Sequence, residues 1–228
     1  MVDPHPKALI VGASRGLGLG LAKELLGRGR HVIATVRSEA GRKALEPYAG
    51  PDGRCGIETI DVAAPGAAAA LRARLEVKRL DFLMINAGVG PSPEMSFEAN
   101  FNAMMAVNVL GALAVLNALE DLVMENGVIA VMSSGLGSIA ANDQGGMEPY
   151  RSSKAALNQS LRSFVAERPD AKWSLTAIAP GWVRTDMGGP DAPLDVETSM
   201  RGVADVLDGR VGARGIAFLN YDGQTLPW

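Results

Sequence analysis

Runs of apolar residues without polar alternation recur along the chain, and each is short enough to be one strand. They lie at 7–11, 31–36, 80–85, 127–132, 173–178 and 215–219, and a shorter strand is expected at 56–60. Continuously apolar strands are typical of a parallel sheet that is covered on both faces. The pattern therefore predicts about seven parallel strands.

Between these runs the apolar positions return at the spacing of a helix. Helices are predicted at 16–28, 66–77, 97–119 and 149–167, with a weaker one at 196–207. Because strand and helix alternate, right-handed crossovers place helices on both faces of the sheet. The predicted fold class is α/β, a Rossmann-type, doubly wound parallel sheet.

Length and composition favour one domain. The chain has 228 residues, 47% of them apolar, and shows no abrupt change in composition. Such a chain can bury a substantial core. We expect a single domain over residues 1–228.

Two stretches, 135–149 and 187–195, are rich in Gly, Pro, Asn and Asp. Such composition favours irregular structure at the surface. In an open α/β sheet, loops that follow the carboxyl ends of strands form the ligand crevice. We expect these two loops, with residues 89–96, to line a substrate site.

A cluster of glycines follows the first predicted strand and opens the first helix. It reads Gly12-Ala13-Ser14-Arg15-Gly16-Leu17-Gly18. Glycines allow a tight turn and close approach to the backbone, and the N–H groups at a helix start attract a pyrophosphate. The spacing predicts a dinucleotide site, and a glycine turn chosen only for packing is the alternative.

The end of the second strand indicates which dinucleotide binds. Arg37 stands where an Asp or Glu would accept hydrogen bonds from a ribose 2′-hydroxyl. Arg15 and Arg37 could instead hold a 2′-phosphate, which guanidinium groups bind well. This favours NADP(H) over NAD(H), with two solvated surface arginines as the alternative.

Tyr150 and Lys154 begin the helix predicted at 149–167. Residues four apart share one face of a helix, so both side chains project to the same side. A cation beside a phenol stabilises tyrosinate and lowers the phenol pKa, which suits proton transfer. The pair alone is weak support, because short motifs arise by chance.

Ser134 supplies the context that this pair needs. It closes the strand at 127–132, at the carboxyl edge of the sheet, where the helix of Tyr150 also starts. Its hydroxyl could bind the oxygen of a substrate. Ser133, Ser134 and Tyr150 could also merely satisfy backbone groups at a strand end and a helix start.

Together these motifs resemble the classical short-chain dehydrogenase/reductase family from the first strand to the last. Within it the chain is most similar to the short C-factor-like (cell-to-cell signalling protein) branch, in residues 132–139, 150–158 and 179–187. The family elements are Gly12, Gly16, Gly18, Asp61-Val62, Asn86-Ala87-Gly88, Asn108, Ser134, Tyr150, Lys154 and Pro180-Gly181-Trp182-Val183-Arg184-Thr185.

On the cofactor side, the resemblance implies that Asp61 contacts the adenine amino group with Val62 beside it. It also implies that Asn86, Ala87 and Gly88 brace the central sheet next to the cofactor. Asp61 could equally be a turn residue.

On the reaction side, the resemblance implies that Asn108 completes a tetrad by holding a water for a proton relay through Lys154. Lys154 would also hold the cofactor ribose. After Pro180-Gly181, the main chain of Val183 and the hydroxyl of Thr185 would bind the nicotinamide carboxamide, whereas local chemistry alone allows a simple Pro-Gly turn.

Two departures from the family pattern stand out. Val11 replaces the Thr that usually precedes the first glycine, which is expected to loosen the hydrogen bonding of the turn. The separation of Ser134 from Tyr150 is longer than is usual in the family, which enlarges a loop on the substrate side.

Charge and rare residues exclude several classes of function. A net charge of −3 without a run of Lys or Arg argues against nucleic-acid and membrane partners. We expect no membrane-spanning run of roughly 20 apolar residues and no secretion signal, hence a cytoplasmic protein. One cysteine and two histidines, His5 and His31, predict neither a disulfide nor a metal site.

The predicted function is an NADP(H)-dependent carbonyl reductase or alcohol dehydrogenase with Tyr150 as acid and base. Its partner would be a small carbonyl or alcohol substrate, and the resemblance implies a homodimer or homotetramer. The alternative is a dinucleotide-binding signalling or regulatory protein of C-factor type with little turnover.

Overall fold

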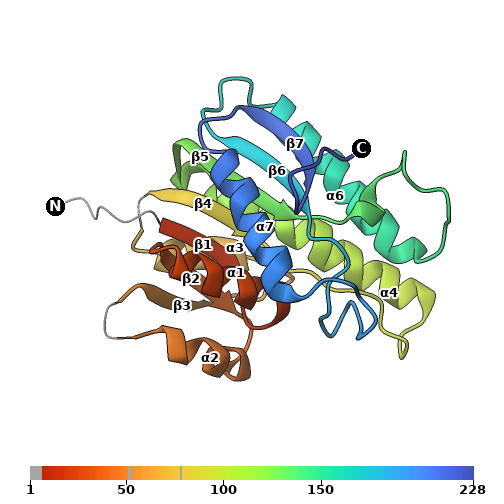
Figure 1. Ribbon diagram of the computed structural model, residues 1–228, viewed down its shortest axis with the longest axis horizontal. Coiled ribbons are helices and arrows are strands. Elements are labelled where there is room, and N and C mark those ends of the chain that lie inside the picture. The colour runs from red at the N-terminus through yellow and green to blue at the C-terminus, as the bar shows by residue number, and fades with distance from the viewer. Residues whose placement is uncertain (1–6, 51–52, 78) are drawn as a thin grey trace.

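Seven parallel strands form one sheet in the order β3-β2-β1-β4-β5-β6-β7 (Figure 1). The computed structural model describes residues 7–50, 53–77 and 79–228, so His5 lies outside the described residues. The strands are β1 (Lys7–Val11), β2 (His31–Val36), β3 (Cys55–Thr59), β4 (Leu80–Ile85), β5 (Val123–Met132), β6 (Ser174–Ala179) and β7 (Gly215–Asn220). The predicted fold class is confirmed.

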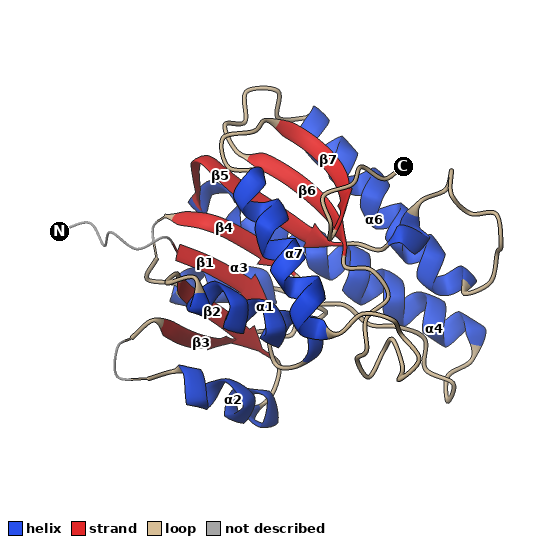
Figure 2. Cartoon of the chain, viewed as in Figure 1, coloured by secondary structure: helices blue, strands red, loops and turns tan. Residues whose placement is uncertain are grey.

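Helices cover both faces of the sheet (Figure 2). On one face lie α1 (Gly16–Gly27), α2 (Glu39–Leu45) and α7 (Val196–Gly209); on the other lie α3 (Ala67–Arg74), α4 (Phe97–Met104), α5 (Ala112–Leu119) and α6 (Glu148–Ala166). Strand β1 is buried on both faces, which explains why its sequence is largely apolar. Leu9 and Val11 pack towards α5 and α6, whereas Ala8 and Ile10 pack towards α1 and α7.

Helix α2 is the element that the sequence pattern did not predict. Its seven residues include Gly41, and Leu45 is its one fully buried side chain among the described residues. So short a helix has no room for a repeating apolar face. Ser38 caps it by accepting a hydrogen bond from the Gly41 N–H.

The helix predicted at 97–119 is present but is not a regular α-helix. A π-helical turn, η2 (Met105–Gly111), separates α4 from α5. Such turns widen the helix locally and occur often at functional sites. The turn includes Asn108, a residue that the family resemblance had singled out.

The expectation of no membrane-length apolar run was wrong for this helical region. Residues Phe97–Leu122 are long and apolar enough, by length and composition, to cross a bilayer. In the fold, however, Val115, Leu116 and Leu119 of this run are fully buried against the sheet. The core accounts for much of its apolar character.

The long loops gather at the carboxyl ends of the strands (Figure 2). The loop at 135–149 was expected to be irregular and at the surface, and this is true of only part of it. It begins with the 3-10 turn η4 (Gly135–Gly137), and Gly137 and Ser138 are buried. Residues 139–148 that follow are all exposed. The loop therefore has a fixed base and an exposed outer part.

Candidate active site

The turn between β1 and α1 accepts only glycine at two positions. Gly12 has a φ of +90°, and a Cβ there would lie 2.8 Å from the main chain of Ala87. A Cβ on Gly18 would lie 2.0 Å from the Gly12 carbonyl oxygen. Both distances are below van der Waals contact, so the close approach excludes a side chain at both positions, and at Gly12 the positive φ disfavours one as well.

Thr35 on β2 holds the turn from the other side. Its hydroxyl accepts a hydrogen bond of 3.0 Å from the Gly12 N–H, and its carbonyl accepts one of 2.7 Å from the Ala13 N–H. The expected loosening at Val11 is therefore not seen, because a neighbouring strand supplies the hydroxyl. Sequence reasoning missed Thr35, although it is a polar residue within an apolar run.

Asn86 ties the end of β4 to the same turn. Its side-chain Nδ2 donates to the Gly12 carbonyl at 2.6 Å, and the N–H groups of Asn86 and Ala87 both donate to the Val11 carbonyl. Gly88 then approaches the opposite half of the site: a Cβ there would lie 3.3 Å from Asn108 Oδ1 and 3.7 Å from Lys154 Nζ.

The amino end of α1 is open. Arg15 occupies the N-cap position, and within this fully described helix no side chain caps the first turn and no acid lies in it. Free N–H groups and the positive end of the helix dipole therefore face outwards. This is the environment that binds phosphate groups.

The two candidate phosphate-binding arginines differ in their surroundings. The Arg15 guanidinium forms an exposed ion pair of 2.5 Å with Asp186, which joins the glycine turn to the loop after β6. Arg37 is exposed at the end of β2.

Asp61 and Val62 follow β3. The Asp61 carboxylate accepts a hydrogen bond of 3.0 Å from the Ala63 N–H, so the residue does form a local turn. The carbonyl of Val62 lies against Gly111 of η2, where a Cβ would come within 2.8 Å.

Tyr150 and Lys154 lie on the first turns of α6. Lys154 is only 4% exposed, and its Nζ lies 5.7 Å from the centre of the Tyr150 ring. Nζ donates a hydrogen bond of 2.9 Å to the Met132 carbonyl, at the end of β5. Burial lowers the pKa of Lys154 to about 8.

Ser134 lies next to this pair. Burial raises the pKa of Tyr150, and a side-chain hydrogen bond with Ser134 acts in the opposite direction. The Ser134 hydroxyl also accepts a hydrogen bond of 3.1 Å from the Leu136 N–H. The structure thus brings Ser134, Tyr150 and Lys154 together at one edge of the sheet.

Asn158, one turn beyond Lys154, links the end of β5 to α6. Its amide accepts from the Ser133 hydroxyl at 2.6 Å and donates to the Gly137 carbonyl at 3.2 Å. A Cβ on Gly137 would lie 2.8 Å from Lys154 Cβ, so the loop packs directly on the helix. Sequence reasoning gave Asn158 no structural role.

Asn108 is buried in η2, and both polar atoms of its amide have hydrogen-bond partners. Oδ1 accepts from the Val89 N–H at 2.8 Å, and Nδ2 donates to the Val89 carbonyl and the Ser153 hydroxyl, each at 3.0 Å. The side chain therefore connects the loop after β4 to α6, at the residue preceding Lys154. These hydrogen bonds offset the free-energy cost of burying the Asn108 amide.

The loop after β6 approaches the glycine turn, because a Cβ on Gly16 would lie 3.6 Å from Thr185 Cγ2. Gly181 has a φ of +80°, and Val183 bridges to Leu194. The Thr185 hydroxyl accepts a hydrogen bond of 3.1 Å from the Gly188 N–H. Pro180 is tied to α7 through its carbonyl, which accepts a bond of 2.6 Å from the Ser199 hydroxyl.

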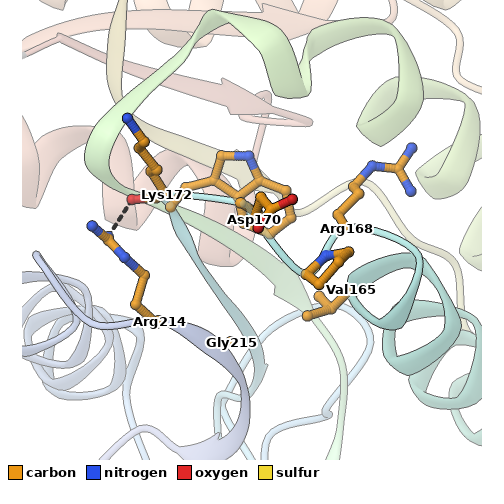
Figure 3. Close-up of a pocket in the computed structure, with 9 residues that line it drawn as sticks. Val165, Arg168, Asp170, Lys172, Arg214 and Gly215 are labelled. Atoms are coloured by element: carbon orange, nitrogen blue, oxygen red, sulfur yellow. Dashed lines mark hydrogen bonds between the residues drawn. The ribbon is translucent and has the colours of Figure 1, made fainter.

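A hollow of about 360 Å³ lies away from these residues (Figure 3). It is lined by Trp173 and Lys172, which precede β6, and by Arg214, which precedes β7, so it opens at the amino ends of the strands. Lys172 is paired with Glu125, and Arg214 donates to the Lys172 carbonyl. Ligands of open α/β sheets bind at the carboxyl ends, so we assign no function to this hollow.

Comparison with known proteins agrees with this geometry. The family model described as short chain dehydrogenase matches residues 6–193. C-signal of Myxococcus xanthus is 36% identical over 154 residues, which cover 65% of this chain and 93% of C-signal. The similarity to a C-factor-like protein is thereby confirmed.

Two solved structures share the fold over nearly all of the chain. A Burkholderia multivorans short-chain dehydrogenase/reductase with bound NADP has a TM-score of 0.91 at 44% identity, covering 99% of this chain and 100% of that one. A carbonyl reductase from Pseudomonas aeruginosa in complex with NADP has a TM-score of 0.86 at 38% identity, covering 98% of this chain and 100% of that one. The chain therefore belongs to the short-chain dehydrogenase family, and by that membership it is an oxidoreductase.

Proposed function

We propose that the protein is an NADPH-dependent carbonyl reductase in which Ser134, Tyr150 and Lys154 act on the substrate oxygen. The observation that carries this proposal is a buried lysine one helical turn from a tyrosine that hydrogen-bonds a serine. Perturbed ionisable groups that converge at the carboxyl edge of a sheet are typical of catalytic sites.

The chemistry follows from the charges. Tyr150 donates its phenolic proton to the carbonyl oxygen, while the Ser134 hydroxyl hydrogen-bonds and polarises that oxygen. The Lys154 ammonium, which is close to Tyr150, stabilises the tyrosinate that forms. Nicotinamide, when bound, supplies the hydride to the carbonyl carbon. Alcohol oxidation uses the same groups in reverse.

The family resemblance implies that Asn108 holds a water for a proton relay, and we propose a separate role for its side chain. Its amide oxygen and nitrogen already bond to Val89, and the nitrogen also bonds to Ser153. We therefore propose that this side chain orients α6, and that any water relay towards Lys154 uses the main chain of η2, which the π-helical turn opens.

The cofactor would lie across the turn after β1. The open amino end of α1, with Gly12, Ser14, Gly16, Leu17 and Gly18 around it, suits a pyrophosphate because glycine leaves room for close approach. Asp61 and Val62 would lie beside the adenine, and Asn86, Ala87 and Gly88 would support the turn. The nicotinamide end would lie near Pro180, Gly181, Val183 and Thr185, with Lys154 at the ribose.

NADP(H) is proposed over NAD(H) because Arg15 and Arg37 supply positive charge where a 2′-phosphate would lie. For Arg15 this requires the guanidinium to leave or share its ion pair with Asp186. Arg37→Asp should lower the preference for NADPH over NADH by about tenfold or more. An unchanged ratio of the two dissociation constants would contradict this assignment.

The substrate is proposed to have an apolar body. Exposed large apolar side chains in the loops at the carboxyl edge include Met95, Met147, Trp182 and Met187. Such side chains favour contact with apolar ligand surface. A panel of aldehydes, ketones and diketones, followed by NADPH consumption, should show higher kcat/KM for the more apolar members.

The central test is Tyr150→Phe, which removes the proton donor but keeps the ring. We expect loss of reductase activity with NADPH binding retained, and Tyr48→Phe serves as a control at a distant tyrosine. Full activity in Tyr150→Phe would reject the mechanism.

A second function, a dinucleotide-binding signalling protein with little turnover, is supported by the similarity to C-signal. The two functions differ in the response to the carbonyl panel. Absence of NADPH consumption across that panel, with NADPH still bound, would favour the signalling function.

We also propose one domain, a cytoplasmic location and a homodimer or homotetramer. Phe97 and Leu110, in the helical run from α4 to α5, are exposed apolar side chains that a partner subunit could cover. Size-exclusion chromatography with light scattering, repeated on Leu110→Glu, tests the assembly. A monomeric wild-type protein would contradict it.

A further inference from the structure

The chain folds back on itself after β7. The Asn220 N–H donates to the Gln224 carbonyl at 2.8 Å, and Leu219 bridges to Thr225. Residues 224–228, here called the return segment, then run back beside β7, towards α6 (Figure 1). The Leu226 N–H donates to the Phe218 carbonyl, and this bond keeps the return segment beside β7.

The return segment ends against the loop that carries Ser134. The main-chain oxygen of Trp228 accepts hydrogen bonds from the N–H groups of Ile139 and Ala140, at 3.0 and 3.1 Å. The Ser138 hydroxyl donates to the same oxygen at 3.4 Å. Three donors from consecutive residues thus converge on one acceptor.

The indole ring of Trp228 fixes where this oxygen lies. It packs on Phe218 of β7, with ring centres 5.2 Å apart, and the guanidinium of Arg162 on α6 lies 5.0 Å from its centre. Ring contacts with both the sheet and α6 thereby hold the main-chain oxygen of Trp228 next to the loop. Aromatic ring pairs and cation–π contacts add about 1 kcal/mol each to the burial of the ring.

A short and tightly bonded stretch connects this anchor to Ser134. The Gly137 N–H donates to the Ser134 carbonyl at 2.9 Å, and the Leu136 N–H donates to the Ser134 hydroxyl. Asn158 holds the middle of the stretch through the Gly137 carbonyl. These bonds connect residues 138–140 to Ser134 through the short turn between them.

We propose that Trp228 is a positioning residue for Ser134, which it orients through the Ser138–Ala140 turn. This inference rests on the proposed function, in which the Ser134 hydroxyl binds the substrate oxygen. Trp228 itself would contact neither the substrate nor the cofactor. Its role is to keep the hydroxyl within hydrogen-bonding reach of the reacting oxygen, where small displacements strongly lower the rate.

The experiment compares Trp228→Ala with Trp228→Phe. The first removes the ring contacts, and the second keeps an aromatic ring on Phe218. Tyr48→Ala is the matched control, because Tyr48 is also a half-buried aromatic residue with a cation over its ring, Lys23 Nζ at 5.2 Å. Reductase kcat and KM, the NADPH dissociation constant and thermal unfolding are measured for each.

We expect Trp228→Ala to lower kcat/KM about tenfold, mainly through kcat, with NADPH binding within about twofold of wild type. Trp228→Phe should restore most of the activity, and Tyr48→Ala should retain it. Unchanged kcat/KM in Trp228→Ala would overturn the proposal. A parallel loss of NADPH binding and folded protein would also overturn it, because that result indicates a purely structural role.

Hydrogen exchange provides a readout that does not need turnover. In Trp228→Ala the amides of Ile139, Ala140 and Leu136 should exchange faster, whereas the Ala13 amide on the cofactor side should not change. If wild type shows no reductase activity, the proposed function fails, and this measurement still tests the link to Ser134. Unchanged exchange at Leu136 would reject that link.

Discussion

The glycine turn after β1 and the Ser134 loop after β5 lie at the same edge of the sheet, but different contacts fix them. At the turn, Gly12 and Gly18 leave no room for a side chain, so backbone shape dominates. At the loop, Asn158 and Trp228 hold the main chain through side-chain contacts from distant elements. The turn combines this steric limit with hydrogen bonds from Thr35 and Asn86, whereas the loop depends on the hydrogen bonds of Asn158 and on the ring contacts of Trp228.

The largest effect should come from removing the cation at the centre of the network. Lys154→Met should lower reductase kcat about a thousandfold, because tyrosinate loses its stabilising charge. Stability at pH 7 should change little, because relief from burying an ammonium whose pKa is lowered to about 8 opposes the loss of its hydrogen bond to the Met132 carbonyl. Steady-state kinetics and urea unfolding check both parts.

The pH dependence of stability provides a control for this variant. The pKa of Lys154 is lower in the folded protein than its ordinary value of 10.5. Between about pH 8 and 10.5 the unfolded chain therefore binds more protons at this site, and wild-type stability gains from rising pH. A Lys154→Met protein with the same slope as wild type across this window would show that the lysine is not the cause.

The next effect should come from filling the turn. Gly18→Ala places a Cβ against the Gly12 carbonyl and should lower the free energy of unfolding by about 2–3 kcal/mol. NADPH binding should weaken as the turn shifts. Gly27→Ala, at a helical glycine with open space around it, is the control and should not lower the free energy of unfolding. Equal stability of the two variants would refute the steric account.

Breaking the network at Asn158 should have a smaller effect. Asn158→Ala leaves Ser133 and the Gly137 carbonyl without a partner, so we expect a loss of about 1–2 kcal/mol in stability and lower kcat. NADPH affinity should stay near wild type. Asn117→Ala removes an exposed amide on α5 as the control, and a similar loss of kcat there would argue against a specific network.

The smallest effect should come from the hydroxyl beside the turn. Thr35→Val keeps the shape of the side chain but leaves the Gly12 N–H without its acceptor, at a cost of about 1 kcal/mol. Titration with NADPH should show a dissociation constant raised a few fold. Thr59→Val, at the end of β3, should leave the dissociation constant unchanged, and an equal change would remove the support for Thr35.

The contrast between the two regions explains how much the sequence could predict. Apolar runs and glycine spacing are local signals, so all seven strands and the turn at Gly12–Gly18 could be predicted. Asn158 and Trp228 act on residues that are far away in sequence, and Thr35 acts across strands. Such contacts depend on tertiary packing, which local patterns do not contain. Helix α2 was missed because so few of its residues are buried.

The exposed outer part of the Ser134 loop has a consequence for how the protein can change. Trp228 holds Ile139 and Ala140 at one end, and the Tyr150 N–H donates to the Met147 carbonyl at the other. Residues 141–146 lie between these ends and add local bonds to them, from the Ala141 N–H to the Ser138 hydroxyl and from Arg151 Nε to the Gly146 carbonyl. Those residues are exposed and contain a turn between Asn142 and Gly145. In the proposed function, insertions and deletions there would alter which molecules enter and would leave Ser134 and Tyr150 in place. The enlarged loop of this chain is one such variation, and it makes these six positions suitable for engineering new substrate preferences.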